Sequence, residues 1–426
     1  IYFVVLRFSN SANESPTIEI VVPEAPSSGK PAVPRRSDID FLRIVVVWLI
    51  LLYHTVDIYI PYAKYYVKDY GPGGIFGLSF FISMNVWNIP MFFFLSGASV
   101  YFALFRRTEL KFREERLHRL LVPAFTLAVT SLTYSLIFFA PLAENCKQYY
   151  QGVKEFNSSL PYKNCEMFYK FTKNDTFKDF MKRIYLPFAS PHQGWFLIYL
   201  FTFSQLLATW FSTFHPNHNG DEMSGPDCCG QKTSCCSKPF SLATKIFGCF
   251  HFFCKPASTP TEFVDAVYWW LGSCVKLAVF PSLWIGIVEA LFRHFFPDGN
   301  LGMFSVFYDF CNDVKYIFVF ILGYALTAAD GHGIKEVIKK GKWWYFVSGT
   351  IVLFVYTGCV MYIRPLLFLP LYLLVTGLLR GFGEWLFILG SYAVCRDIIT
   401  KTYHWISVLS VIAMPYYLTH QQVRNK

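Results

Sequence analysis

The chain has 426 residues, of which 54% are hydrophobic, 20% aromatic and only 15% charged. This composition excludes a soluble globular protein, and recurring long apolar runs predict an all-α, polytopic transmembrane helical bundle. The net charge of +10 is compatible with nucleic-acid binding, but excess Lys and Arg is also expected in the cytoplasmic loops of membrane proteins. Because no basic array is interleaved with aromatic residues, the predicted partner is the lipid bilayer and not nucleic acid.

The first 37 residues are rich in Pro and Ser and predict a flexible cytoplasmic leader. Residues 38–426 form one predicted transmembrane domain, with about nine helices present of an expected ten or more. The chain begins without Met and stops at Lys426 just after an apolar run, which indicates a fragment truncated at its C-terminus. The apolar runs are 40–60, 79–104, 120–142, 193–214, 265–293, 314–329, 343–362, 366–395 and 405–419.

Arg43 and His54 stand eleven residues apart in the first apolar run, so both project from one face of a helix. The helical rise puts His54 about 16 Å deeper than Arg43, near the middle of a ~30 Å hydrocarbon layer. Asp40 and Asp57 lie one turn outside this pair and extend it to a polar stripe. Ionisable groups facing lipid are costly, which favours a stripe that faces a wet cavity or the protein interior. A polar contact that holds helices together explains the stripe equally well.

Two motifs lie at the second and fourth runs. Ser96-Gly97, in the segment NIPMFFFLSGAS, is a small pair that allows two membrane helices to approach closely. Close packing is the favoured role for Ser96, and catalysis is the alternative. Trp195 opens the fourth run in PHQGWFL, where a Trp is most often an anchor at the membrane interface.

The basic segments indicate the orientation of the chain. Residues 105–119 carry six Lys and Arg in fifteen positions, and residues 330–342 carry four in thirteen. Both segments are therefore predicted to be cytoplasmic. The N-terminus and the Arg43 end of the first helix are then also on the cytoplasmic side.

Arg113, Arg116 and Arg119 are spaced three apart in the first basic segment. On a helix they lie on adjacent turns and can bind a polyphosphate through bidentate hydrogen bonds. A positively charged anchor at the cytoplasmic face accounts for the charge equally well, although it does not account for the regular spacing.

The segment 142–191 is predicted to be an extracytoplasmic loop. It contains two glycosylation sequons, at Asn157 and Asn174, which predict a glycoprotein. It also contains Cys146 and Cys165, which could form a disulfide in an oxidising lumen.

The segment 215–264 is predicted to be a Cys-rich cytoplasmic insert. Its thiols occur as two adjacent pairs five residues apart, which does not match the usual spacing of zinc ligands. Palmitoylation beside a membrane helix and inert thiols are the two favoured interpretations, so no metal site is predicted. The candidate palmitoylation sites are Cys228, Cys229, Cys235 and Cys236.

The long run 366–395 permits one tilted helix or two short ones broken near Arg380. A single crossing is preferred because it keeps Arg396 and Lys401 on the predicted cytoplasmic side.

Five segments in order resemble motifs of the membrane-bound acyltransferase-3 superfamily, across about residues 36–423, and the glucan biosynthesis protein C type is the most similar subgroup. The first-helix motif is matched by DIDFLRIVVVWLILLYH with its Arg-x10-His spacing, and the second-helix motif by NIPMFFFLSG. The Arg-x-x-Arg element is best matched by Arg116 and Arg119. GWFLIYL is similar to the Trp-Phe-Leu segment, and MPYYLTHQQV, with His420, to the Tyr-x-x-His-Gln motif.

The resemblance implies an integral-membrane O-acyltransferase. Members of the family move an acyl group, often acetyl, from cytoplasmic acyl-CoA to a hydroxyl acceptor, usually a carbohydrate and sometimes a lipid. No permanently bound cofactor is implied, because acyl-CoA is the donor substrate. A eukaryotic endomembrane or the plasma membrane is the expected location.

The resemblance also implies roles for individual residues. His54 would act as general base on the acceptor hydroxyl, with Asp57 orienting its ring. Arg43 would bind donor phosphate or stabilise the oxyanion, and Arg116 and Arg119, with Arg113, would hold the phosphates of coenzyme A. The remaining candidates for the substrate cavity are Ser96, Trp195 and His420.

Three departures from the family pattern stand beside these matches. His192 lies three residues before Trp195, where many members have a His two residues before the Trp, and the Cys-rich insert is not a family feature. The truncated end would also remove the closing helices.

A transporter or channel is the competing class, because intramembrane Arg, His and Asp also mark ion pathways. An inactive relative acting as a scaffold is a third possibility.

Overall fold

The structure is a computed structural model that describes residues 6–8, 18–20, 36–57, 74–105, 107–126, 195–215, 259–295, 310–363, 368–401 and 403–413. Seven helices in these ranges are long and apolar enough to cross a membrane. The chain is therefore an all-α, multi-pass membrane protein, as its composition predicts. The seven helices are α1 (Ser37–Asp57), α2 (Gly74–Leu104), α8 (Trp195–Thr213), α12 (Cys274–Phe295), α14 (Phe310–Ala328), α15 (Ile334–Gly358) and α16 (Leu369–Ile398).

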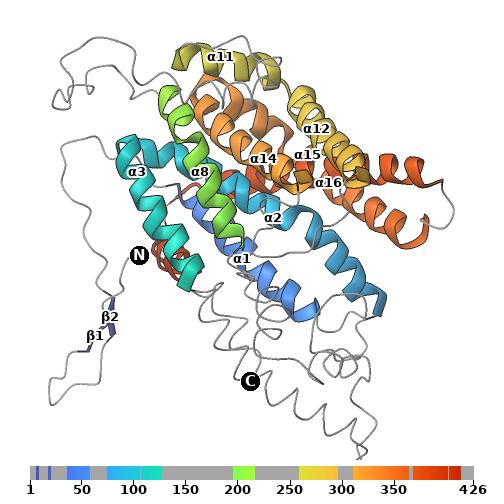
Figure 1. The fold of residues 1–426 in the computed structure, drawn as a ribbon, viewed down its shortest axis with the longest axis horizontal. Helices are drawn as coiled ribbons and strands as arrows, with labels where there is room; N and C mark the ends of the chain where they lie inside the picture. The colour runs from blue at the N-terminus through green and yellow to red at the C-terminus, as the bar shows by residue number, and fades with distance from the viewer. Residues whose placement is uncertain are drawn as a thin grey trace, which may run out of the picture.

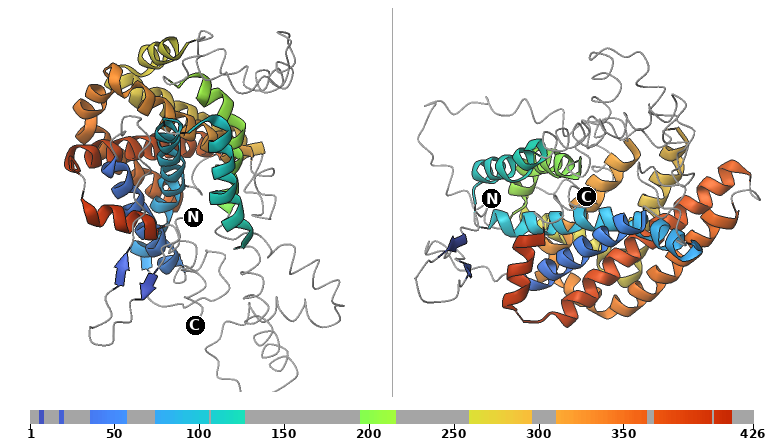
Figure 2. Two further views of the ribbon diagram at one scale, coloured as in Figure 1. Left: turned by 90° about the vertical axis from the view of Figure 1, so that its left-hand side faces the viewer. Right: turned by 90° about the horizontal axis from the view of Figure 1, so that it is seen from below.

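Shorter elements flank the seven helices. Two three-residue strands pair in antiparallel register at the N-terminal end, and Figures 1 and 2 show this ribbon away from the helices. The short elements are β1 (Leu6–Phe8), β2 (Ile18–Ile20), α3 (Glu109–Arg116), the π-helix η1 (Leu117–Leu121), α11 (Pro260–Leu271), the 3-10 helix η5 (Ala329–His332), the π-helix η6 (Cys359–Ile363) and an apolar helix His404–Ala413.

Most of the predicted apolar runs are confirmed as helices. The run 366–395 is one uninterrupted helix, α16, which confirms the preferred single crossing. The runs 120–142 and 405–419 lie only partly in the described residues, at 120–126 and 405–413.

Two predicted boundaries are wrong. The run 265–293 is divided at Gly272, where α11 ends, so that only α12 is long enough to span a membrane. The predicted loop 330–342 is mostly helical, because α15 already begins at Ile334. Its Lys and Glu residues are good helix formers, and Gly333 supplies the left-handed turn (φ 91°) that separates η5 from α15.

Several helix ends meet at one end of the bundle, here called the arginine-rich end. Asp330 accepts hydrogen bonds from Arg396 (2.5 Å) and Arg36 (3.4 Å), which joins the end of α14 to the start of α1 and the end of α16. His215, just after α8, lies 3.2 Å from the backbone oxygen of Tyr101 in the last turn of α2. At the opposite end of the bundle, the hydroxyl oxygens of Ser83 on α2 and Thr357 on α15 are 2.9 Å apart and form a hydrogen bond.

Glycine permits the closest helix crossings. A Cβ added at Gly97 of α2 would lie 1.9 Å from the backbone oxygen of Phe320, and one added at Gly323 of α14 would lie 2.0 Å from that of Phe94. The two glycines therefore let the α2 and α14 backbones touch, as small residues do in membrane helix pairs. The predicted close approach is found at Gly97, and the role of Ser96 stays a prediction.

Helices α15 and α16 run side by side over most of their length (Figure 2). Gly349 of α15 and Gly390 of α16 each lie so close to the partner backbone that a Cβ would approach it within 2.5 Å. Helix α11 lies across the arginine-rich end in Figure 1, where Phe263 packs on Phe214 after α8 with ring centroids 4.8 Å apart.

Candidate functional site

Arg43 bridges the first two helices close to the arginine-rich end. Its Nη1 lies 3.1 Å from Oδ1 of Asp40, one turn earlier on α1. Its Nη2 donates a 2.7 Å hydrogen bond to Oγ of Ser99 on α2, and that hydroxyl in turn donates to the backbone oxygen of Leu95. The polar stripe is thus continued onto α2 through Ser99, one turn after the predicted Ser96, which is half-buried.

His54 lies in the last turn of α1, near the opposite end of the bundle. The side chain is half-buried beside the ring of Tyr53, whose centroid is 5.3 Å away. His54 is two residues before Val56, where the candidate span Ser37–Val56 ends, so it lies near one end of that span, and its depth in the bilayer stays a prediction. Asp57 is the last residue of α1. Arg43 and His54 mark two regions separated by about 16 Å of helix rise.

An arginine cluster, defined as Arg43, Arg107, Arg116 and Arg119, gathers beside the first of these regions. Burial, together with the positive charges of the other three arginines, lowers the pKa of Arg116 to about 10, while Glu115 opposes these effects. Arg116 also lies over the ring of Phe112 (not part of the cluster), at 4.8 Å from the centroid.

Two acids form ion pairs with arginines of the cluster. Glu115 pairs with Arg107 and with Arg119, and Asp40 pairs with Arg43. Among the described residues, these two carboxylates pair with three of the four arginines of the cluster. A concentration of guanidinium groups suits a phosphate-bearing ligand.

Arg113 is turned away from this cluster and fastens α3 to α8. Its guanidinium donates to the backbone oxygen of Gln205 (2.8 Å), to Oγ1 of Thr209 (2.8 Å) and to Oε1 of Glu109 (2.9 Å). Figure 1 shows the two helices side by side. These contacts show that Arg113 holds two helices together, whereas Arg116 and Arg119, at the same three-residue spacing, belong to the arginine cluster.

Glu109 is the acid at the same junction. Burial would raise the pKa of its carboxyl, but hydrogen bonds from Thr209, Arg113 and Ser212 outweigh burial and lower it below the usual value. The π-helical turn η1 follows directly after Arg116. Arg119 belongs to this turn, and both it and Arg116 are members of the cluster, while Arg113 is not.

Trp195 belongs to an aromatic cluster inside the bundle. Its ring lies 5.4 Å from Tyr199 and 6.2 Å from Tyr316 on α14. Tyr316 stacks on Phe93 of α2 at 4.7 Å. The Trp-Phe-Leu and NIPMFFFLSG segments are therefore joined through α14.

Several predicted residues lie outside the described residues. The sequons, the thiols of both loops and the final motif all belong to this group, so their placement stays a prediction. They are Asn157, Asn174, Cys146, Cys165, Cys228, Cys229, Cys235, Cys236, His192 and His420.

Sequence reasoning missed a buried ion cluster in three other helices. Glu289 of α12, Lys315 of α14, and Arg380 and Glu384 of α16 lie together, and Lys315 and Glu384 are both fully buried. Each of these residues is an ionisable group within an apolar run, and that pattern could have marked it as a candidate functional residue. Sequence alone did not show that the four face one another.

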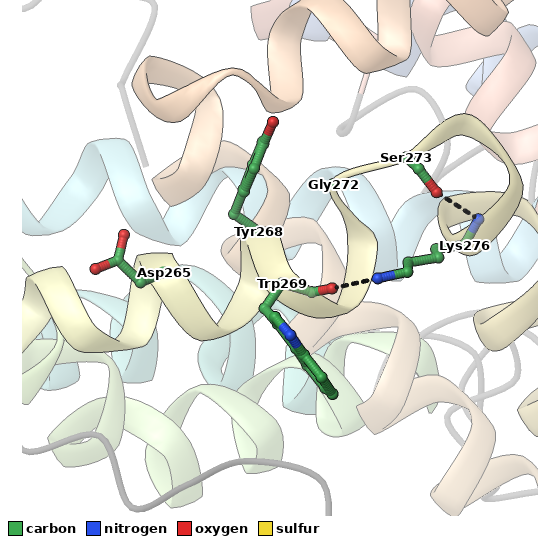
Figure 3. Close-up of a pocket in the computed structure, with 6 residues that line it drawn as sticks. All are labelled: Asp265, Tyr268, Trp269, Gly272, Ser273 and Lys276. Carbon is green, nitrogen blue, oxygen red and sulfur yellow. Dashed lines mark hydrogen bonds between the residues drawn. The ribbon is translucent and has the colours of Figure 1, made fainter.

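A surface cavity of about 400 Å³ lies at the corner between α11 and α12 (Figure 3). Lys276 there donates to the backbone oxygen of Trp269 (3.0 Å) and lies 5.4 Å from its ring centroid. Exposed aromatic and basic residues at a helix end are typical of an anchor at the membrane interface. The residues that line it include none of the predicted site residues; they are Asp265, Tyr268, Trp269, Gly272, Ser273 and Lys276.

Comparison with known proteins adds no further support. No family model, curated protein or solved structure matches the chain. The resemblance of five segments to the acyltransferase-3 superfamily therefore stays a prediction, and function has to be argued from the arginine cluster and His54.

Proposed function

We propose that the chain is an integral-membrane O-acyltransferase of the acyltransferase-3 type. It moves an acyl group, acetyl by analogy with the family, from acyl-CoA to the hydroxyl group of a carbohydrate or lipid acceptor. The donor binds at the arginine-rich end, which the positive-inside bias assigns to the cytoplasm.

The observation that carries the proposal is the convergence of two motifs. Arg43 comes from the first-helix motif, and Arg116 and Arg119 come from the Arg-x-x-Arg element more than seventy positions later. All three belong to one arginine cluster, in which the positive charges of Arg43 and Arg119 act on Arg116. The positive-inside bias accounts for basic residues at this end of the bundle. It does not account for several arginines lying close enough to one another for their charges to interact. The phosphates of coenzyme A are a suitable ligand for that charge.

The separation of Arg43 and His54 favours one of the two roles considered for Arg43. About 16 Å of helix rise lies between them, so one thioester carbonyl cannot touch both side chains. Arg43 is therefore assigned to the donor phosphates, and the extended pantetheine arm carries the thioester toward His54. In the proposed step His54 takes the proton of the acceptor hydroxyl and the oxygen attacks the thioester carbonyl. The carbon–sulfur bond then breaks, and the thiolate leaves with that proton.

A transporter is the second candidate, and the buried ion cluster favours it. Lys315, Glu289 and Glu384 lie inside helices that span the membrane, where ionisable residues often mark an ion or proton path. That candidate gives no reason for the arginine cluster, which lies on different helices.

The test is acyl transfer in membranes that contain the chain, supplied with acetyl coenzyme A labelled in the acetyl group. Transfer of label to membrane glycan or lipid is expected for the unaltered chain, and His54→Ala should reduce it by about 10² or more, as loss of a general base does. His404→Ala is the matched control, because His404 is exposed and belongs neither to the arginine cluster nor to the last turn of α1.

Two results would count against the proposal. Label transfer that survives His54→Ala removes the role of His54 as base. Absence of transfer with every acceptor class, together with uptake of a solute that depends on a proton gradient, favours the transporter.

A further inference from the structure

The buried ion cluster is independent of the residues used in the proposed function. Lys315 Nζ lies 3.3 Å from Oε2 of Glu289 and 3.6 Å from Oε2 of Glu384, and the Lys315 side chain is fully buried. Arg380 Nη1 donates a 2.6 Å hydrogen bond to Oε1 of Glu289. Three helices that span the membrane thus bring two acids and two bases together.

The two carboxyl groups have very different surroundings. Both oxygens of Glu289 accept hydrogen bonds, from Arg380 and Lys315, and the thiol of Cys311 lies 3.6 Å from Oε2. Among the described residues, neither oxygen of the buried Glu384 carboxyl has a hydrogen-bond partner, and Lys315 Nζ is 3.6 Å from Oε2. An ionised carboxylate needs donors when it is removed from water, so Glu289 is built to hold a charge and Glu384 is not.

We propose that Glu384 is a proton-exchanging site inside the membrane domain, with Glu289 as the fixed anion of the cluster. When Glu384 carries a proton, Lys315 and Glu289 form a neutral buried pair, and Arg380 keeps part of its side chain exposed. When the proton leaves, Lys315 lies between two carboxylates and supplies the counter-charge. Both states are therefore compatible with the same packing.

Among the described residues, the titratable groups recorded around Glu384 belong to the cluster or interact with one of its members. They are Glu289 from α12, Lys315 and Cys311 from α14, and Arg380 from its own helix, with Tyr316 beside Lys315 and Tyr356 acting on Arg380. Carboxyl groups in such positions serve as proton relays in membrane proteins.

The first measurement is infrared difference spectroscopy of the purified full chain in liposomes, stepped between acidic and alkaline pH. The unaltered chain should show a C=O stretching band of a carboxyl group in an apolar environment that grows on acidification. Glu384→Gln should abolish this band, and Glu289→Gln should leave it in place. A band that is absent from the unaltered chain, or that persists in Glu384→Gln, overturns the proposal.

Thermal unfolding of the same variants gives a second, independent test. Gln resembles a protonated Glu in shape and charge, so Glu384→Gln should unfold at the same temperature as the unaltered chain at acidic pH. Glu289→Gln leaves Arg380 and Lys315 without their shared anion and should lower the unfolding temperature. Equal losses in the two variants would mean that Glu384 is a permanent anion, and would contradict the proposal whether or not acyl transfer is detected.

Discussion

Arg43 and Arg113 are chemically identical side chains that do different things. Arg113 uses its guanidinium to bind α8 at Gln205 and Thr209. Arg43 contacts Asp40 and Ser99, and its charge also acts on Arg116. The difference follows from where each side chain can reach, which the residue type does not reveal. Affinity for an anion should therefore depend on the arginine cluster and not on basic charge in general.

Replacing Arg116 and Arg119 by Gln should weaken binding of coenzyme A to the purified chain. Each charge-assisted hydrogen bond contributes about 1.5–3 kcal/mol, so the double variant should bind at least about tenfold more weakly. Titration calorimetry with coenzyme A measures this directly.

The matched control for that variant removes the same charge elsewhere. Lys339 and Lys340 of α15 are exposed, and the predicted orientation places them on the same side of the membrane. Their replacement by Gln should change the affinity little, apart from a general salt-dependent effect. Equal losses in the two double variants would remove the specific role of the cluster.

At the scale of elements, two kinds of contact position the candidate site. Polar contacts attach α3 to α8, and glycine contacts hold α2 against α14. The polar contacts fix the position of α3. They thereby position Arg116 at the end of α3 and Arg119 in η1, because α3 and η1 are continuous. The second kind fixes α2, which carries Ser99 beside Arg43.

The junction of α3 and α8 should weaken on acidification. The lowered pKa of Glu109 means that its carboxylate stabilises the folded chain above its ordinary pKa, and this contribution is lost as the pH falls through the lowered value. Glu109→Gln should therefore reduce stability by about 1 kcal/mol at neutral pH and flatten the dependence on acid pH. Hydrogen exchange of α3 at several pH values is the measurement, with the exposed Glu114→Gln as control.

Gly97→Ala should disturb the crossing of α2 and α14. Its new Cβ would lie 1.9 Å from the backbone oxygen of Phe320, so the helices must separate, at a cost of about 1–3 kcal/mol. Gly358→Ala, where a Cβ meets nothing within 4 Å, should be neutral or slightly stabilising. Thermal unfolding in detergent distinguishes them, and equal unfolding temperatures would show that the crossing tolerates a side chain.

At the scale of the whole molecule, the bundle has two chemically different ends. Arg36, Arg396 and the arginine cluster lie at one end, while His54 lies near the other. A donor that binds by its phosphates and an acceptor that reaches His54 would therefore approach from opposite sides. The proposed reaction depends on this orientation in the membrane.

The orientation makes a prediction about glycosylation. If the arginine-rich end is cytoplasmic, Asn157 and Asn174 face the lumen, and digestion with an endoglycosidase should increase electrophoretic mobility in two steps. Asn157→Gln and Asn174→Gln should each remove one step. An N-terminal tag should meanwhile be digested by protease added to the cytoplasmic side of sealed vesicles. A tag protected from that protease would reverse the orientation and with it the side from which the donor enters.

The sequence by itself determined the class of protein, because long apolar runs in a chain this poor in charge can be buried only in a bilayer. It also located most spans, and it placed Arg43 and His54 on one helix face, since helical periodicity depends on local spacing alone. It missed the end of α11 before Gly272, which interrupts an otherwise apolar run. It also missed the helical start of α15, because charged residues form helices as readily as loops.

Only the tertiary structure decided which polar groups meet. It separated Arg113 from the arginine cluster, gave Arg43 a partner in Ser99 of α2, and placed His54 in the last turn of α1. It also brought Lys315 to Glu289 and Glu384 from helices far apart in the chain. Spacing along the chain fixes the direction of a side chain around its own helix. Which helix lies opposite depends on packing between segments that are remote in sequence.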